Sequence, residues 1–161
     1  MDFHTLYSRY ASDVKRFILC LSGDPALAED ITAETFVRAW TAPGRIRSAT
    51  VKSYLFTIAR NQYLQGLRRH KKHAGLDERT PDPTPDPQHR ATQRQALGRV
   101  LGGLAKLPEI DRAALLMRAQ DELPYADIAR TLGLSISGVR VKVHRARLKL
   151  AQLRQPQEDS A

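Results

Sequence analysis

The sequence predicts an all-α protein with two small helical domains joined by a flexible, proline-rich linker. Apolar residues recur three and four positions apart through most of its 161 residues, and no β-branched run alternates with polar residues long enough for a sheet. Between residues 81 and 87, prolines alternate with acidic and small residues, which forbids a helix. We expect domains at 1–72 and 91–155, a linker at 73–90 and a disordered tail at 156–161.

Three helices are predicted in the first domain. An apolar stripe runs over residues 3–21, and Gly23 follows as a stop signal. Asp24 is a suitable N-cap for a second helix over residues 25–40, which has proline at its first position. After a Thr-Ala-Pro-Gly interruption, a third helix should begin between residues 48 and 51 and reach about residue 70.

Four helices are predicted in the second domain. An amphipathic helix covers residues 97–104, and the Leu-Pro-Glu sequence at 107–109 closes it and opens the next. A short helix is predicted over residues 124–132, with Pro124 at its start. Ser135 can cap the last helix, whose apolar stripe continues over residues 136–153.

Ala129, Gly133 and Val139 have the spacing of a helix-turn-helix. Alanine allows two helices to cross closely, glycine permits a positive φ in the turn, and valine packs the second helix onto the first. At about 100° per residue, the opposite face of the last helix is available to read DNA. The candidate reading residues on and beside that face are Ser137, Gly138, Arg140, Val141, Lys142, His144 and Arg145.

Charge favours a polyanionic partner, because 26 basic residues against 17 acidic ones give a net charge of +9 and a pI near 10.1. Carboxylates are absent from residues 35–76 and from residues 128–157, and both windows are rich in Lys and Arg. These windows predict two cationic surfaces, although solvated helix faces that merely lack acids remain an alternative for either one.

Several functional classes are excluded. No apolar run is long enough for a membrane span, the N-terminus lacks a secretory signal, and the lone Cys20 cannot form an internal disulfide, so we expect a cytoplasmic protein. Paired carboxylates, a phosphate loop and a nucleophile constellation are missing, which argues against an enzyme. Five scattered histidines and one cysteine predict no metal site, and no cofactor is expected.

Motifs in both halves resemble the extracytoplasmic-function branch of the sigma-70 family of bacterial RNA polymerase sigma factors. Residues 28–36 with 38–40 are similar to region 2.2 of that family, and residues 54–61 with Arg68 and Arg69 are similar to regions 2.3 and 2.4. Residues 107–109, 123–129, 132–135 and 143–147 resemble region 4. The resemblance covers nearly the whole chain, from Phe3 to about Leu153.

The resemblance implies that the first domain docks on core RNA polymerase and opens the minus-ten element of promoter DNA, while the second reads the minus-thirty-five element. The implied polymerase contacts are Asp30, Ala33, Glu34 and Phe36, with Trp40 a further candidate, although Phe36 and Trp40 equally fit core packing. The implied minus-ten contacts are Arg45, Arg47, Ser48, Lys52, Tyr54, Arg60, Asn61, Arg68 and Arg69. A restraining anti-sigma factor is a further implied partner.

The chain departs from the family pattern at three positions. Ala33 stands where glutamine is usual and removes one hydrogen bond to polymerase, Tyr54 replaces a common tryptophan, and Gln65 replaces a common aspartate. These departures bear on the strength of promoter opening. An operator-binding regulator that uses only the second domain is the alternative, and it predicts tight duplex binding without polymerase.

Overall fold

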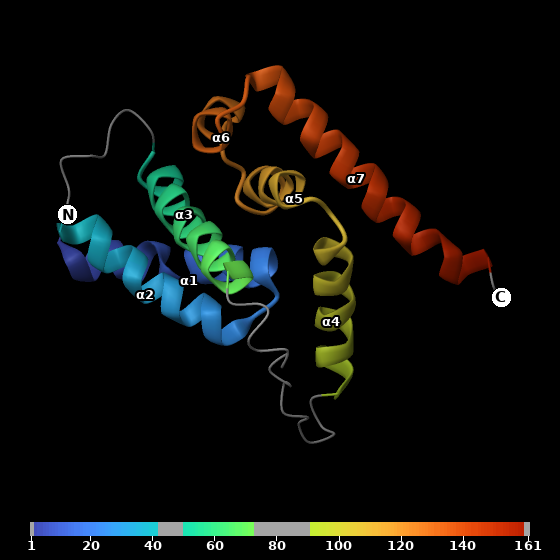
Figure 1. Ribbon diagram of the computed structural model, residues 1–161, viewed down its shortest axis with the longest axis horizontal. Coiled ribbons are helices and arrows are strands. Elements are labelled where there is room, and N and C mark those ends of the chain that lie inside the picture. The colour runs from blue at the N-terminus through green and yellow to red at the C-terminus, as the bar shows by residue number, and fades with distance from the viewer. Residues whose placement is uncertain (1, 42–49, 73–90, 160–161) are drawn as a thin grey trace.

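The computed structural model describes residues 2–41, 50–72 and 91–159, and every regular element in those ranges is a helix (Figure 1). This confirms the all-α prediction. The linker predicted at 73–90 lies outside the described residues. No helix in the described part of the chain has the length and apolarity that a membrane span requires.

The first unit consists of α1 (Phe3–Ser22), α2 (Pro25–Thr41) and α3 (Val51–Lys72). The expected signals set the boundary between α1 and α2, because Gly23 has a φ of 73° and Asp24 Oδ1 accepts a hydrogen bond from Leu27 N at 3.2 Å. Phe17 of α1 stacks on Phe56 of α3 with ring centroids 4.4 Å apart. This stack joins the first and third helices of the unit at its centre.

The second unit consists of α4 (Ala91–Ala105), α5 (Glu109–Leu115), the π-helical turn η3 (Leu116–Gln120), α6 (Tyr125–Leu132) and α7 (Ile136–Asp159). The π-helical turn continues directly from α5, so one expected helix has two parts. The last helix reaches Asp159, past the expected end near residue 155 and into the segment predicted as a tail.

The helix-turn-helix between α6 and α7 has the predicted geometry. Gly133 adopts a φ of 69°, and Leu134 N donates to Ala129 O at 2.9 Å. Ser135 Oγ caps α7 by accepting a hydrogen bond from Gly138 N at 3.0 Å. Val139 is fully buried between the two helices. Gly133 and Ser135 therefore have the roles predicted for them, and Val139 is buried as expected.

The two units pack against each other. Helix α6 contacts α3 and lies next to its start (Figure 1), and α1 contacts α4, α5 and η3. Arg112 of α5 donates to the carbonyl oxygen of Leu21 at the end of α1, and also to those of Leu104 and Leu107. Polar side chains of the two units form hydrogen bonds and ion pairs with each other, as described below.

Candidate nucleic-acid and polymerase interfaces

Helix α7 presents the predicted reading face to solvent. Its opposite face holds Val139, Val143 and Ala146 in the core. Among the reading candidates, Gly138 and Lys142 are half-buried, and the rest are exposed: Ser137, Arg140, Val141, His144 and Arg145. The amphipathic stripe thus orients the candidate DNA-reading residues outwards.

Ion pairs and ring contacts hold three of the cations at this face. Asp111 of α5 is buried and pairs with two of them: its Oδ2 lies 3.2 Å from Arg145 Nε, and its Oδ1 lies 3.7 Å from Lys142 Nζ. The Arg140 guanidinium lies over the Tyr125 ring at 5.2 Å from the centroid. The cationic face of α7 is therefore partly ordered before any ligand binds.

The candidate minus-ten residues on α3 divide into two groups. Asn61, near the middle of the helix, and Arg68 and Arg69, in its second half, are exposed. Lys52, Tyr54 and Arg60 face inwards to different degrees, and Arg60 is the most buried. Arg45, Arg47 and Ser48 lie outside the described residues, so the loop predicted to capture a flipped base has no structural account.

Arg60 forms a bidentate ion pair with Glu109 at the start of α5. Its Nε and Nη2 donate to the two carboxylate oxygens at 2.8 and 2.6 Å, and the two side chains are 11% and 21% exposed. Arg60 therefore cannot contact DNA while the units are packed together, and its predicted minus-ten role stays a prediction that requires the units to separate. The physical reason is that a carboxylate of the other unit already occupies the guanidinium.

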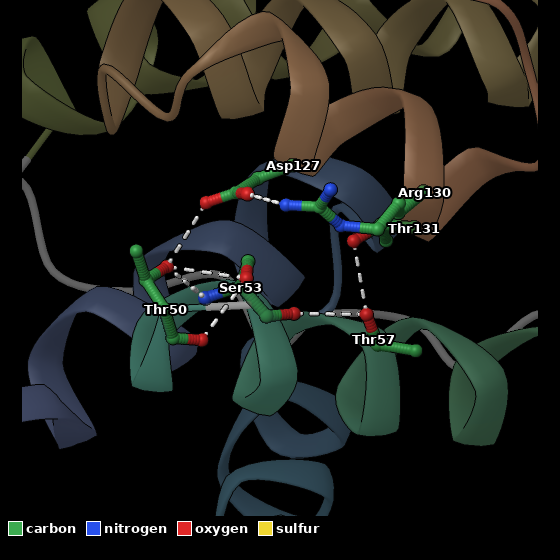
Figure 2. Close-up of polar contacts among 6 residues, drawn as sticks. All are labelled: Thr50, Ser53, Thr57, Asp127, Arg130 and Thr131. Atoms are coloured by element: carbon green, nitrogen blue, oxygen red, sulfur yellow. Dashed lines mark hydrogen bonds and ion pairs between the residues drawn. The ribbon is translucent and has the colours of Figure 1, made fainter. Parts of the chain in front are cut away.

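A second polar contact joins α3 to α6, as Figure 2 shows. Thr50 Oγ1 donates to Asp127 Oδ2 at 3.3 Å, and the hydroxyls of Thr57 and Thr131 are 3.0 Å apart. Arg130 pairs with the other carboxylate oxygen of Asp127, while Ser53 N donates to Thr50 Oγ1 at 3.2 Å. The first helix of the helix-turn-helix is thus fixed on the start of α3.

A third contact places a buried carboxylate between cations of the first unit. Asp121 Oδ1 lies 3.1 Å from Lys52 Nζ and 3.2 Å from Arg16 Nη2. Burial raises the pKa of Asp121, and the nearby Lys52 and Arg16 charges partly oppose that rise. Its Oδ2 is buried and has no hydrogen-bond partner among the residues that the structure describes. Lys52 also pairs with Asp13 at 3.3 Å, so this candidate minus-ten cation is neutralised from both units.

The candidate polymerase-docking residues on α2 are exposed with one exception. Asp30, Ala33 and Glu34 point to solvent, and Glu34 Oε1 accepts from Arg38 Nε at 3.1 Å. Phe36 is 0% exposed, which corrects its assignment as a contact residue, because its ring packs in the core and meets Tyr7 edge-on. Trp40, 47% exposed on the last turn, is the aromatic side chain available to a partner.

The acids that contact the cationic candidates were not identified from the sequence. Glu109, Asp111 and Asp121 pair with candidate cations and lie between the two acid-free windows, whereas Asp13, the other partner of Lys52, precedes both windows. Their position between the two cationic windows was the available signal. Periodicity alone could not reveal which acid meets which cation, because most of these pairs join separate helices.

Comparison with known protein families divides the chain as its two units do. A family model described as "Sigma-70 region 2" matches residues 6–73, and one described as "Sigma-70, region 4" matches residues 97–150. The chain is 30% identical to the ECF RNA polymerase sigma factor SigM of Bacillus subtilis over 95% of both chains. It is 32% identical to ECF sigma factor SigL of Mycobacterium tuberculosis, over 92% of this chain and 88% of that protein.

Two solved structures share the fold. The sigma factor RpoE of Bartonella quintana, crystallised with the anti-sigma factor NepR, matches with a TM-score of 0.77 at 24% identity over 94% of this chain and 96% of that one. CnrH, solved with the cytosolic domain of CnrY, matches with a TM-score of 0.70 at 25% identity over 94% and 86% of the two chains. With near-complete coverage of its sequence relatives and both family regions in order, this chain belongs to the extracytoplasmic-function group of sigma-70 family RNA polymerase sigma factors.

Proposed function

We propose that this chain binds bacterial core RNA polymerase and directs promoter-specific transcription initiation. The observation that carries the proposal is the presence of two cationic helical surfaces in one chain, one of them on a helix-turn-helix. The family membership supports the order of the two tasks: minus-ten opening in the first unit and minus-thirty-five reading in the second. The domain limits of 1–72 and 91–155 follow from the sequence and remain part of the proposal.

The minus-thirty-five element is read by the exposed face of α7. Arg140 and Arg145 are suited to guanine or phosphate, and Val141 offers an apolar contact for a thymine methyl group. Ser137, Gly138, Lys142 and His144 complete the proposed surface. Its burial pattern supports this role, because the opposite face of α7 is packed in the core and cannot meet a ligand.

The minus-ten element is bound by α3 and the loop before it. The side chains of Asn61, Arg68 and Arg69 are exposed to solvent while the two units are packed together. Lys52 and Arg60 instead form ion pairs with acids of the second unit. Strand capture through Lys52 and Arg60 requires that phosphates replace Asp121 and Glu109 as their partners. We infer that the units separate when the promoter is engaged, so closed packing is the resting arrangement.

Core polymerase docks on the exposed face of α2. Asp30 and Glu34 lie one helical turn apart and present two carboxylates to a basic partner, with Trp40 on the last turn of the same helix. An anti-sigma protein is a second partner, by analogy with the complex in which a structural relative was crystallised. Because both partners act with the polymerase, we propose a cytoplasmic location for the chain.

Reconstitution tests the proposal. The full chain with bacterial core polymerase should transcribe a promoter library selectively and make thymines of the minus-ten element reactive to permanganate. Neither component should do so alone. Strong promoter occupancy without core polymerase and without strand opening would instead identify an operator-binding regulator.

Polymerase docking is tested by charge reversal. The pair Asp30→Lys with Glu34→Lys should reduce capture of core polymerase at least about tenfold, since like charges across an interface repel. A matched control, Ser8→Lys with Ser12→Lys, adds positive charge to the exposed face of α1 and should retain capture. Equal capture by the reversed pair and by the wild-type chain would reject α2 as the docking site.

A further inference from the structure

A buried carboxylate lies behind the DNA-reading face of α7. Asp111, near the start of α5, has a side chain that is 3% exposed, and its carboxylate is flanked by two cations of the other helix. Arg145 Nε lies 3.2 Å from Oδ2, and Lys142 Nζ lies 3.7 Å from Oδ1. These two cations are three residues apart, so they project from the same side of α7 towards α5.

The contact is made through one edge of the Arg145 guanidinium. A guanidinium has N–H donors on Nε and on both terminal nitrogens in a rigid planar fork. Nε is the nitrogen nearest to Asp111, and the terminal nitrogens hold no hydrogen bond to another described residue, so they are open to another acceptor. The Arg145 side chain is 56% exposed, which places that free end in solvent. Two terminal nitrogens are what a guanine O6 and N7 pair requires.

We propose that Asp111 is a positioning residue for promoter recognition, which fixes Arg145 so that its terminal nitrogens face one base of the minus-thirty-five element. This inference rests on the proposed reading of DNA by α7 and adds a residue from outside the helix-turn-helix. Asp111 does not itself touch DNA, because its carboxylate is enclosed by α5 and α7.

A purely structural role for the carboxylate accounts poorly for this arrangement. Burying a carboxylate has a desolvation cost that an apolar side chain between α5 and α7 would avoid. One partner, Arg145, is more than half exposed, and such a partner adds little to stability because water screens its charge. What the carboxylate adds is direction, since it restricts a long and flexible side chain to one orientation.

The negative charge does not prevent DNA from approaching. Asp111 shares an open surface pocket with Lys106, Lys142, Arg145 and Lys149. Those cations outnumber the carboxylate, so the local field remains attractive to phosphate. Lys106 and Lys149 are exposed and have no proposed role in base reading, which leaves them to contact the backbone.

Pre-ordering of Arg145 has a measurable consequence. An arginine that is mobile in the free protein loses rotamer freedom on binding, whereas one already held by Asp111 loses less. Removal of Asp111 should therefore weaken recognition of the preferred base by about 2- to 10-fold. Sequences that already lack that base should change less, so the loss appears as reduced discrimination at one position.

The test uses holoenzyme reconstituted from the full chain and bacterial core polymerase, on a promoter library randomised across the minus-thirty-five element. Transcript sequencing gives base preference at each position. Asp111→Asn should flatten the preference at the position that Arg145→Ala flattens, and the double variant should lose no more than Arg145→Ala alone. Asp111→Glu, which keeps the charge, should restore part of the preference. Asp127→Asn removes a buried carboxylate that contacts α3 and should change no position.

Arg145→Lys provides a second measurement that does not alter the buried carboxylate. Lysine keeps the positive charge but has no fork, so the same preference should be lost while overall DNA binding persists. Several results would overturn the proposal: unchanged preference in Asp111→Asn, uniform weakening at all positions, or tighter binding to every sequence. Absence of any minus-thirty-five preference in the wild-type holoenzyme would also overturn it, and would reject DNA reading by α7 as well.

Discussion

Replacement of Glu109 by glutamine should loosen the packing of the two units. The substitution keeps the size of the side chain but removes the charge that pairs with Arg60, whose guanidinium is largely buried. Breaking a fully buried pair costs about 3–5 kcal/mol. Because the Glu109 side chain retains 21% exposure, some water reaches the site, and we expect a loss of about 2–3 kcal/mol.

Thermal unfolding measures the loss of stability. For a chain of this size, 1 kcal/mol corresponds to about 2–4 °C, so the Tm of Glu109→Gln should fall by about 4–12 °C. The distance between units gives a second readout. With Cys20→Ser removing the native thiol, spin labels at Ser8→Cys on α1 and Leu148→Cys on α7 should show a broader distance distribution in the variant.

Glu34→Gln is the matched control for this experiment. It breaks the Glu34–Arg38 pair, which is about half exposed and lies within one helix, so its cost should stay below about 0.5 kcal/mol. If Glu109→Gln shifts the Tm no more than Glu34→Gln and leaves the label distances unchanged, the pair does not hold the units together and the reasoning fails.

Burial leads to two further predictions. The pKa of Asp121 is raised in the folded state, so the folded protein binds the Asp121 proton more tightly than the unfolded chain does. The stability that this proton contributes is lost as the pH rises above the ordinary value of 3.8. The stability of Asp121→Asn relative to wild type should therefore increase between pH 3 and pH 7 in urea unfolding, and a decrease would contradict the assignment. Phe36→Ala should cost about 3–5 kcal/mol of stability, whereas Trp40→Ala should leave stability nearly intact and weaken core polymerase capture. If Phe36→Ala instead weakened polymerase capture and Trp40→Ala reduced stability, Phe36 would again be the contact residue.

Local signals predicted most of the fold. Gly23, Asp24, Gly133 and Ser135 each act within a few residues of the backbone, so their roles are readable without knowledge of distant packing. The apolar stripes likewise depend only on helical periodicity. The π-helical turn after Leu115 was not predicted, because no residue there marks a change in hydrogen-bond register.

The candidate site was less predictable where one residue type has two uses. A cation on α3 can bind phosphate or an acid of the other unit, and only the packing of the units distinguishes the two for Arg60 and Lys52. Similarly, Phe36 and Trp40 lie on one helix with comparable apolar surface. The rotation of α2 against α1 and α3 places Phe36 inside and leaves Trp40 accessible.

Competition for the same cations links the packing of the units to promoter binding. The pair between Arg60 and Glu109 is largely buried, so dissolved salt screens it weakly. The proposed contacts of Arg60 and Lys52 with promoter phosphates would form at an open nucleic-acid surface, where the strength of such contacts falls steeply as salt rises. Increasing salt therefore disfavours the DNA-bound arrangement more than the closed one. If the proposed minus-ten contacts are right, Glu109 and Asp121 occupy the positions that phosphates would take, and the balance between the closed and DNA-bound states depends on how far each ion pair is shielded from water.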